Sequence, residues 1–186
     1  METKLVREVM IPIESYVTVH EEDSLLKVIM ILGSSKGPDK RRAHRDAVVV
    51  NKEGDFIGKV TMIDIFRLLE PNYNKIDVDE IVASGKGELT EDVITDAYKD
   101  FNFWVEPSKT ICERADVKKV SELMHVPKKG EYIAEEDSIE KALHLYVAGA
   151  HQPLIVKKGD TVTGMLRFGD IFEVIRESLL SCSTSI

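Results

Sequence analysis

Residues 58–66 read Gly-Lys-Val-Thr-Met-Ile-Asp-Ile-Phe, and residues 164–172 read Gly-Met-Leu-Arg-Phe-Gly-Asp-Ile-Phe. The second stretch follows the first by 106 positions, and Gly, Asp, Ile and Phe recur in register. An internal repeat of this kind indicates that one structural unit occurs twice in the chain. The fourth letter differs, because Thr61 of the first copy is replaced by Arg167 in the second. We therefore expect two structural units with the same fold that no longer perform identical work.

The repeat extends upstream of this motif with a different spacing. Glu-Glu-Asp-Ser at residues 21–24 recurs at residues 135–138, which is 114 positions later. The first copy therefore carries eight extra residues between residue 24 and the motif. Residues 33–42 are rich in glycine, serine and proline, which is typical of a loop, so we place the extra residues there.

Each copy shows the same succession of hydrophobic patterns. A short strand (16–19 or 131–134) precedes an Asp-Ser cap and a helix with apolar residues at i, i+3, i+4 and i+7. A fully apolar strand (47–50 or 153–156) follows, then a tight turn, a strand that ends in the motif, and a last helix. One such β-α-β-β-α unit of roughly 60 residues has little core of its own. We therefore predict an α+β fold in which two units pack sheet to sheet about a pseudo-twofold axis.

These patterns divide the chain into three parts. Residues 4–70 form the first repeat, residues 118–178 form the second, and residues 71–117 belong to neither. The intervening part has a helix start at Leu89-Thr90-Glu91-Asp92 and contains the only tryptophan, Trp104. We predict at least one helix there, which packs on the repeats or on a partner chain.

Composition narrows the classes of function. The 186 residues include 25 Lys and Arg against 33 Asp and Glu, a net charge of −8, which argues against binding to nucleic acid. No apolar run approaches the roughly 20 residues that span a bilayer, and the amino-terminal residues do not resemble a signal peptide. The two cysteines lack metal-binding spacing and fit a reducing compartment. We expect a cytoplasmic protein without a membrane partner or bound metal.

The tandem β-α-β-β-α unit with Gly-x-x-Thr-x-x-Asp before its last helix resembles a CBS-domain pair, also called a Bateman module. The resemblance covers roughly residues 4–70 and 118–178. It implies that an adenosine ligand binds in clefts between the repeats, with AMP, ADP or ATP as the expected ligand and S-adenosylmethionine as another candidate. It implies no required cofactor.

The resemblance also implies roles for individual residues. Asp64 and Asp170 would hold ribose hydroxyls, and Thr61 would contact ribose or phosphate. A carboxylate suits a cis-diol because it can accept both hydroxyl hydrogen bonds. The remaining positions would line the base pocket or offer backbone groups to the adenine edge: Val60, Ile63, Leu166 and Phe168 for the pocket, and Tyr16, Val17, Tyr132 and Ile133 for the edge.

Three basic residues are candidates for phosphate contact. Arg45 and His151 stand at equivalent positions before their strands, where relatives in the family place a basic residue against phosphate. Arg167 has two interpretations: it could reach a phosphate, or it could form a salt bridge with Asp170 and close the second site. Asp64 also has a purely structural interpretation, because Thr-x-x-Asp is a helix-capping pattern.

Enzyme signatures are missing from the sequence. It contains no recognisable Ser-His-Asp or Cys-His order, no phosphate-binding glycine loop and no Cys/His metal spacing. We therefore interpret the chain as a sensor rather than an enzyme. We expect it to bind an adenine nucleotide, to form a homodimer and to pass its signal to an unknown effector protein. The alternative is a ligand-free scaffold for protein–protein interaction.

Overall fold

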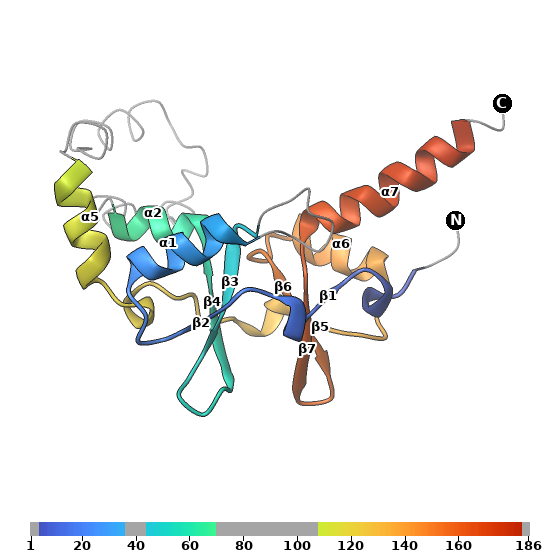
Figure 1. Cartoon of the computed structure of the whole chain (residues 1–186). Coiled ribbons are helices and arrows are strands. Elements are labelled where there is room, and N and C mark those ends of the chain that lie inside the picture. Colours follow the sequence, from blue (N-terminus) through green and yellow to red (C-terminus); the bar gives the residue numbers. More distant parts are fainter. Residues whose placement is uncertain (1–3, 36–43, 70–107, 184–186) are drawn as a thin grey trace, which may run out of the picture.

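The computed structural model describes residues 4–35, 44–69 and 108–183, and it confirms the tandem β-α-β-β-α fold (Figure 1). The first repeat consists of β2 (Thr18–His20), α1 (Leu25–Ser34), β3 (Asp46–Val50), β4 (Phe56–Thr61) and α2 (Met62–Leu69). The second consists of β5 (Tyr132–Ala134), α6 (Ile139–Val147), β6 (Leu154–Lys158), β7 (Thr161–Leu166) and α7 (Phe168–Ser183). The first strand of each repeat begins later than the expected positions 16 and 131, because regular pairing starts only at Thr18 and Tyr132.

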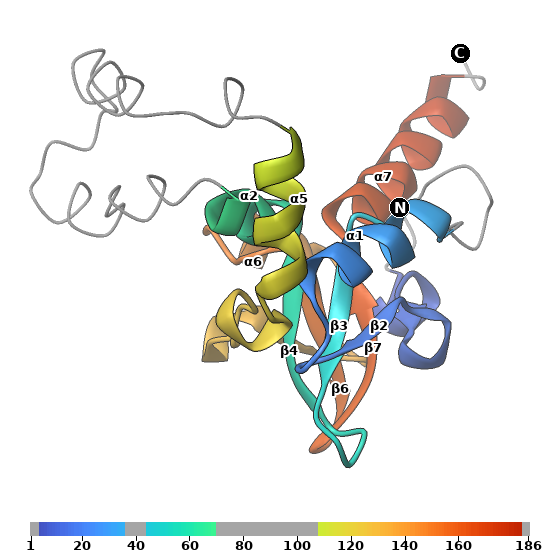
Figure 2. The ribbon, with the colours of Figure 1, turned by 60° about the vertical axis from the view of Figure 1, so that its left-hand side comes forward.

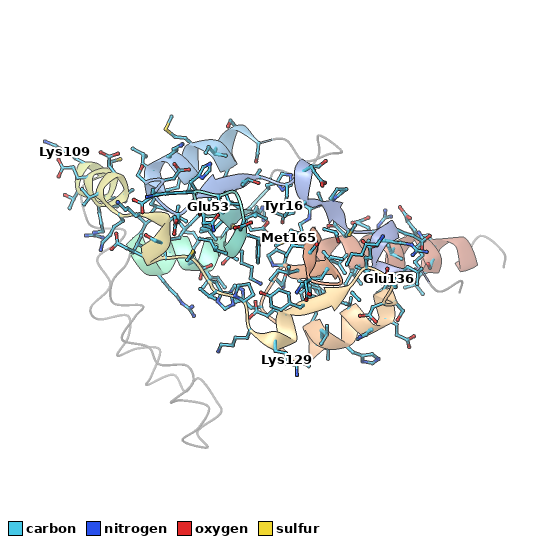
Figure 3. All side chains as sticks on the ribbon, turned by 90° about the horizontal axis from the view of Figure 1, so that it is seen from below. Tyr16, Glu53, Lys109, Lys129, Glu136 and Met165 are labelled. Atoms are coloured by element: carbon cyan, nitrogen blue, oxygen red, sulfur yellow. The ribbon has the colours of Figure 1, made fainter. Side chains whose placement is uncertain are left out.

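The two repeats build two sheets with the same internal topology. In the first, β2 is parallel to β3 and β3 is antiparallel to β4; in the second, β5 is parallel to β6 and β6 is antiparallel to β7. A cluster of buried side chains joins the sheets, and it includes Tyr16, Val48, Ile155 and Met165. Figure 3 shows Tyr16 and Met165 at the centre of the molecule, between the repeats. The predicted sheet-to-sheet packing is therefore observed.

The segment that precedes each repeat crosses over and completes the sheet and core of the other repeat. Short strand β1 (Ile11–Pro12) pairs with β7 of the second repeat, and Val6 donates its N–H to the Asp137 carbonyl at 2.8 Å. Reciprocally, Val120 donates its N–H to the Asp23 carbonyl at 2.9 Å. Val6 accordingly lies in the core of the second repeat, whereas Val120 lies in the core of the first. The two halves therefore depend on each other for their cores.

The glycine that opens each copy of the motif is required sterically, because the segment that crosses from the other repeat passes close to it. A Cβ atom on Gly164 would lie 2.7 Å from the carbonyl oxygen of Ile11, and one on Gly58 would lie 2.9 Å from that of His125. Real Cβ atoms essentially never come so close to a backbone oxygen. Glycine therefore recurs because the crossing segment lies directly on the last strand of each sheet.

The intervening part of the chain contributes helix α5 (Ser108–Val117), which packs against α1 and α2 (Figure 2). Ala115 is buried in the core of the first repeat. A helix at the end of the intervening part therefore packs on the first repeat. The helix expected from Leu89, together with Trp104 and most of the loop at 33–42, lies outside the described residues.

The last helix, α7, runs to Ser183, beyond the expected limit of the repeat at residue 178, and extends away from the sheets (Figure 1). It exposes apolar side chains, including Phe172, Leu179 and Leu180. Within the described parts of the chain, no helix combines the length and apolar character that a bilayer span requires.

Replacing Gly164 by alanine should lower the free energy of unfolding by about 1–3 kcal/mol, because the added methyl group overpacks a rigid contact. Urea denaturation followed by circular dichroism measures the change. Gly130→Ala is the matched control, because a Cβ atom there meets nothing within 4 Å. Equal stability of the Gly164 variant and the control would contradict the steric explanation.

Candidate functional site

Asp64 lies at the start of α2, where it bonds to the residue three positions before it. The backbone N–H and the hydroxyl of Thr61 both donate to Asp64 Oδ2, at 2.9 and 2.7 Å. The Asp64 residue is only 6% exposed. A carboxylate at this place is stabilised by the helix dipole and caps the first turn. The capping interpretation is therefore realised in the structure, and it fixes the carboxylate in one orientation.

Asp170 has a different partner at the equivalent position. Arg167 Nε donates to Asp170 Oδ2 at 2.7 Å, and its Nη2 donates to Oδ1 at 2.8 Å. This two-pronged ion pair, whose hydrogen bonds raise the pKa of Arg167, engages both carboxylate oxygens. Of the two interpretations of Arg167, the structure shows the salt bridge.

Three polar side chains of the first repeat lie close enough to this ion pair for the Arg167 charge to act on their pKa values: Tyr16, His44 and Asp46. The Tyr16 hydroxyl donates to Asp46, and the Tyr16 ring meets the His44 ring edge-on, with centroids 4.8 Å apart. Arg167 interacts electrostatically with Tyr16, His44 and Asp46. Burial raises the pKa of Tyr16 and that of Asp46. The second site is therefore a crowded polar cluster built from both repeats.

The first site is also built across the repeats. His151, just before β6, is close enough to Asp64 for the carboxylate to influence its pKa, although burial is the main effect and lowers that pKa. The His151 ring stacks on the His125 ring, with centroids 4.1 Å apart and planes 14° apart. His125 itself is paired with Lys59 of β4 through two backbone hydrogen bonds.

A buried ion pair lies beneath the two histidines. Lys59 is fully buried, and its Nζ lies 2.7 Å from Glu131 Oε2 and 2.7 Å from each of two carbonyl oxygens, those of His151 and Pro153. Burial lowers the pKa of Lys59, but three acceptors around one nitrogen require the charged ammonium. Burial alone would raise the pKa of Glu131, yet hydrogen bonds from Lys59 and His125 outweigh it and lower that pKa to about 2.

Sequence reasoning missed Lys59, Glu131 and His125. The repeat contained a signal for Lys59, because Met165 occupies the equivalent position in the second copy. A lysine in a strand register where the other copy has a buried apolar residue needs a partner. Nothing local to Glu131 identified it as that partner, since it lies 72 residues away in the chain.

The predicted residues fall into three environments. Thr61 bonds to Asp64 at the first site, where the Asp64 charge acts on the pKa of His151. Arg167 bonds to Asp170 at the second site, where the Arg167 charge acts on the pKa of Tyr16. The side chains of three others pack in the hydrophobic cores: Val60, Ile133 and Leu166. The rest lie at edges: Val17 and Tyr132 are half-buried, Phe168 packs edge-on against Tyr146, and Ile63 and Arg45 are exposed.

An open pocket of about 250 Å³ adjoins the first site. Its walls are Asp64, Arg67 and Leu68 of α2 on one side and residues 122–125 on the other. The Asp64 carboxyl group and the His125 residue therefore share one cavity. Their arrangement offers an acceptor for hydroxyl groups close to the first turn of a helix.

Replacing Lys59 by methionine, the residue found at the equivalent position, should lower the free energy of unfolding by about 3–5 kcal/mol, because the buried Glu131 carboxylate loses its ammonium partner. Adding Glu131→Gln to that variant should recover part of the loss, since the buried charge is removed. Chemical denaturation measures both.

Lys27→Met is the control, because Lys27 forms an exposed ion pair with Asp23 whose loss should cost less than about 0.5 kcal/mol. A Lys59→Met protein as stable as the wild type would show that the buried ion pair is not needed.

Comparison with known proteins identifies the fold. The CBS domain family matches residues 6–71. No curated protein sequence matches the chain significantly. Among solved structures, the CBS domain of a membrane protein from Sphaerobacter thermophilus is similar with a TM-score of 0.55 and 20% identity, over 91% of this chain and 86% of that one. CBSX2 in complex with AMP is similar with a TM-score of 0.56 and 16% identity, over 93% of this chain and 96% of that one.

The CBS domain of a bacterial CNNM/CorC family Mg²⁺ transporter, in complex with ATP, gives a TM-score of 0.53 and 16% identity, over 91% of this chain and 85% of that one. These similarities extend across both repeats and agree with the topology described above. Residues 6–71 therefore match the CBS domain family, and the described chain as a whole has the fold of a CBS-domain pair.

Proposed function

We propose that this protein is a regulatory module that binds an adenine nucleotide, AMP, ADP or ATP, at the site of Asp64. The observation that carries the proposal is the fixed, buried Asp64 carboxylate beside an open pocket, at the first turn of α2. Structures of the same fold hold AMP and ATP. The protein is proposed to act as a cytoplasmic sensor.

The chemistry of the first site suits such a ligand. Asp64 can accept hydrogen bonds from the ribose hydroxyls, and charge-assisted bonds of this type are about twice as strong as neutral ones. The backbone N–H groups of the first turn of α2 attract a phosphate group. His151 can add one ring N–H while it is neutral, the form that burial favours because it lowers the His151 pKa.

The second site has a different role in this proposal. Arg167 occupies both oxygens of Asp170, so a ribose must displace a bidentate ion pair to bind there. We therefore expect one nucleotide per chain. The Arg167–Asp170 pair would serve to hold the second site closed.

Regulation would follow from a shift between conformations. A ligand that contacts Asp64 of one repeat and His151 of the other favours the arrangement in which both contacts form, by no more than its differential affinity. The exposed apolar side chains of α2 and α7, which include Met62, Phe66 and Phe172, offer a surface for a homodimer. An unknown effector protein would receive the signal.

Titration calorimetry with AMP, ADP, ATP and S-adenosylmethionine tests the proposal, and at least one of them should bind. Asp64→Asn should weaken that binding at least tenfold, because the charge is lost. The stability of the ligand-free protein should change by less than about 1 kcal/mol, because the asparagine oxygen can still cap the helix.

Asp116→Asn on the exposed face of α5 is the matched control and should bind as the wild type does. No heat with any of the four ligands, from folded protein, would contradict the proposal.

A ligand-free scaffold for protein–protein contact is the second candidate. It is favoured by one observation: both motif carboxylates already have partners within the chain, Thr61 for Asp64 and Arg167 for Asp170. The calorimetric titration separates the two candidates directly.

Replacing Arg167 by threonine copies the first motif into the second. The expected result is a second nucleotide equivalent per chain, because Asp170 is released from its ion pair. Equilibrium dialysis with labelled nucleotide counts the equivalents. An unchanged stoichiometry would mean that Arg167 is not what closes the second site.

A further inference from the structure

We propose that His125, Glu131 and His151 form a binding site for a divalent transition-metal ion, with Zn²⁺ as the best match. Each residue offers one ligand atom, and these atoms all lie within 4.8 Å of one another. Two imidazoles and one carboxylate are a ligand set that zinc sites use, with a further position left open.

The pair of His125 and Glu131 is already close to the geometry that an ion needs. His125 Nε2 lies 2.8 Å from Oε1 and 2.9 Å from Oε2 of Glu131. Tetrahedral coordination with bonds of about 2.0–2.1 Å places two ligand atoms roughly 3.3 Å apart. Replacing the shared proton by an ion therefore requires a widening of only about half an ångström.

His151 supplies an observation that packing does not explain. Its Nδ1 atom is buried and has no hydrogen-bond partner within the described part of the chain. Buried polar atoms without a partner are rare and call for a specific reason. Because the His125 and His151 rings are stacked nearly parallel, one ring must turn for both to reach a common ion.

The ligands are held in place by contacts that lie outside the proposed coordination shell. Lys59 exchanges two backbone hydrogen bonds with His125, and its Nζ contacts both Glu131 and the His151 carbonyl. Glu131 also accepts the N–H of Lys128 at 3.0 Å. Such outer contacts orient the ligands of known metal sites.

The same contacts select the kind of ion. Lys59 offsets the charge of Glu131, so the site has little net negative charge with which to hold Ca²⁺ or Mg²⁺. Those ions prefer oxygen ligands, whereas imidazole suits zinc and its transition-metal neighbours.

The fold itself does not require these three residues. In the other half of the molecule, the equivalent positions are occupied by Ile11, Val17 and Arg45, and the backbone pairing is the same. The histidines and the glutamate are therefore additions to a frame that forms without them. An ion bound there would link β4 of the first repeat, through His125, to the second repeat, through Glu131 and His151.

Titration of the untagged, full-length protein with Co²⁺ tests the proposal without any nucleotide. One equivalent of Co²⁺ should produce visible absorption bands of a coordinated ion, Zn²⁺ should abolish them by displacement, and Mg²⁺ should not. His151→Gln should weaken Co²⁺ binding at least tenfold. His144→Gln, on the exposed face of α6, is the matched control and should bind as the wild type does.

Glu131 is a poor choice for this test, because its removal leaves Lys59 as an unpaired buried charge. The proposal is overturned if folded wild-type protein gives no cobalt bands, or if His151→Gln binds Co²⁺ as tightly as His144→Gln does. Asp64→Asn should retain cobalt binding, because Asp64 is not one of the three proposed ligands. His151 takes part in both proposals, so the Asp64 variant is the one that tells the failure of the metal site from the failure of the nucleotide site.

Discussion

The reciprocal crossing of the segments before each repeat is the constraint on which the rest of the structure depends. Val6 fills the core of the second repeat, and Val120 fills the core of the first. The crossing brings Ile11 and His125 onto the outer edges of the last strands, where only glycine leaves room for their carbonyl oxygens. It also sets both motif aspartates at the boundary between the repeats, because each aspartate lies just after the strand that the crossing segment contacts.

Within this symmetric frame, a few substitutions make the two sites chemically different. Because Thr61 of the first motif is replaced by Arg167 in the second, the motif carboxylate bonds to a small hydroxyl group in one site and to a guanidinium group in the other. At another pair of equivalent positions, Lys59 places a buried charge in the first half and Met165 places an apolar side chain in the second. A buried charge persists only with a partner of opposite sign, and Glu131 stands where the other half has Val17. The asymmetry therefore extends from the surface of the sites to the centre of the molecule.

The sequence predicted the fold well because the doubled motif fixed the repeat, and apolar periodicity then located the helices and central strands. It was less accurate for the first strand of each repeat, since three residues carry too short a pattern to define a boundary. The crossing could not be predicted, because local patterns do not reveal which distant segment a strand edge will meet. For Arg167 the sequence left two interpretations, and only the placement of Asp170 relative to the guanidinium showed the ion pair.

The crossing also governs how the nascent chain can fold. Leu5 pairs with Ser138, and Val120 returns to Asp23, so neither core closes until most of the polypeptide has been made. Contacts between residues so far apart in the chain carry a large loop-closure cost and slow folding. During synthesis, the apolar faces of β3, β4 and α1 must wait for the segment around Val120. In this architecture, the order of the segments along the chain determines how long these apolar faces are exposed to chaperones and proteases during synthesis.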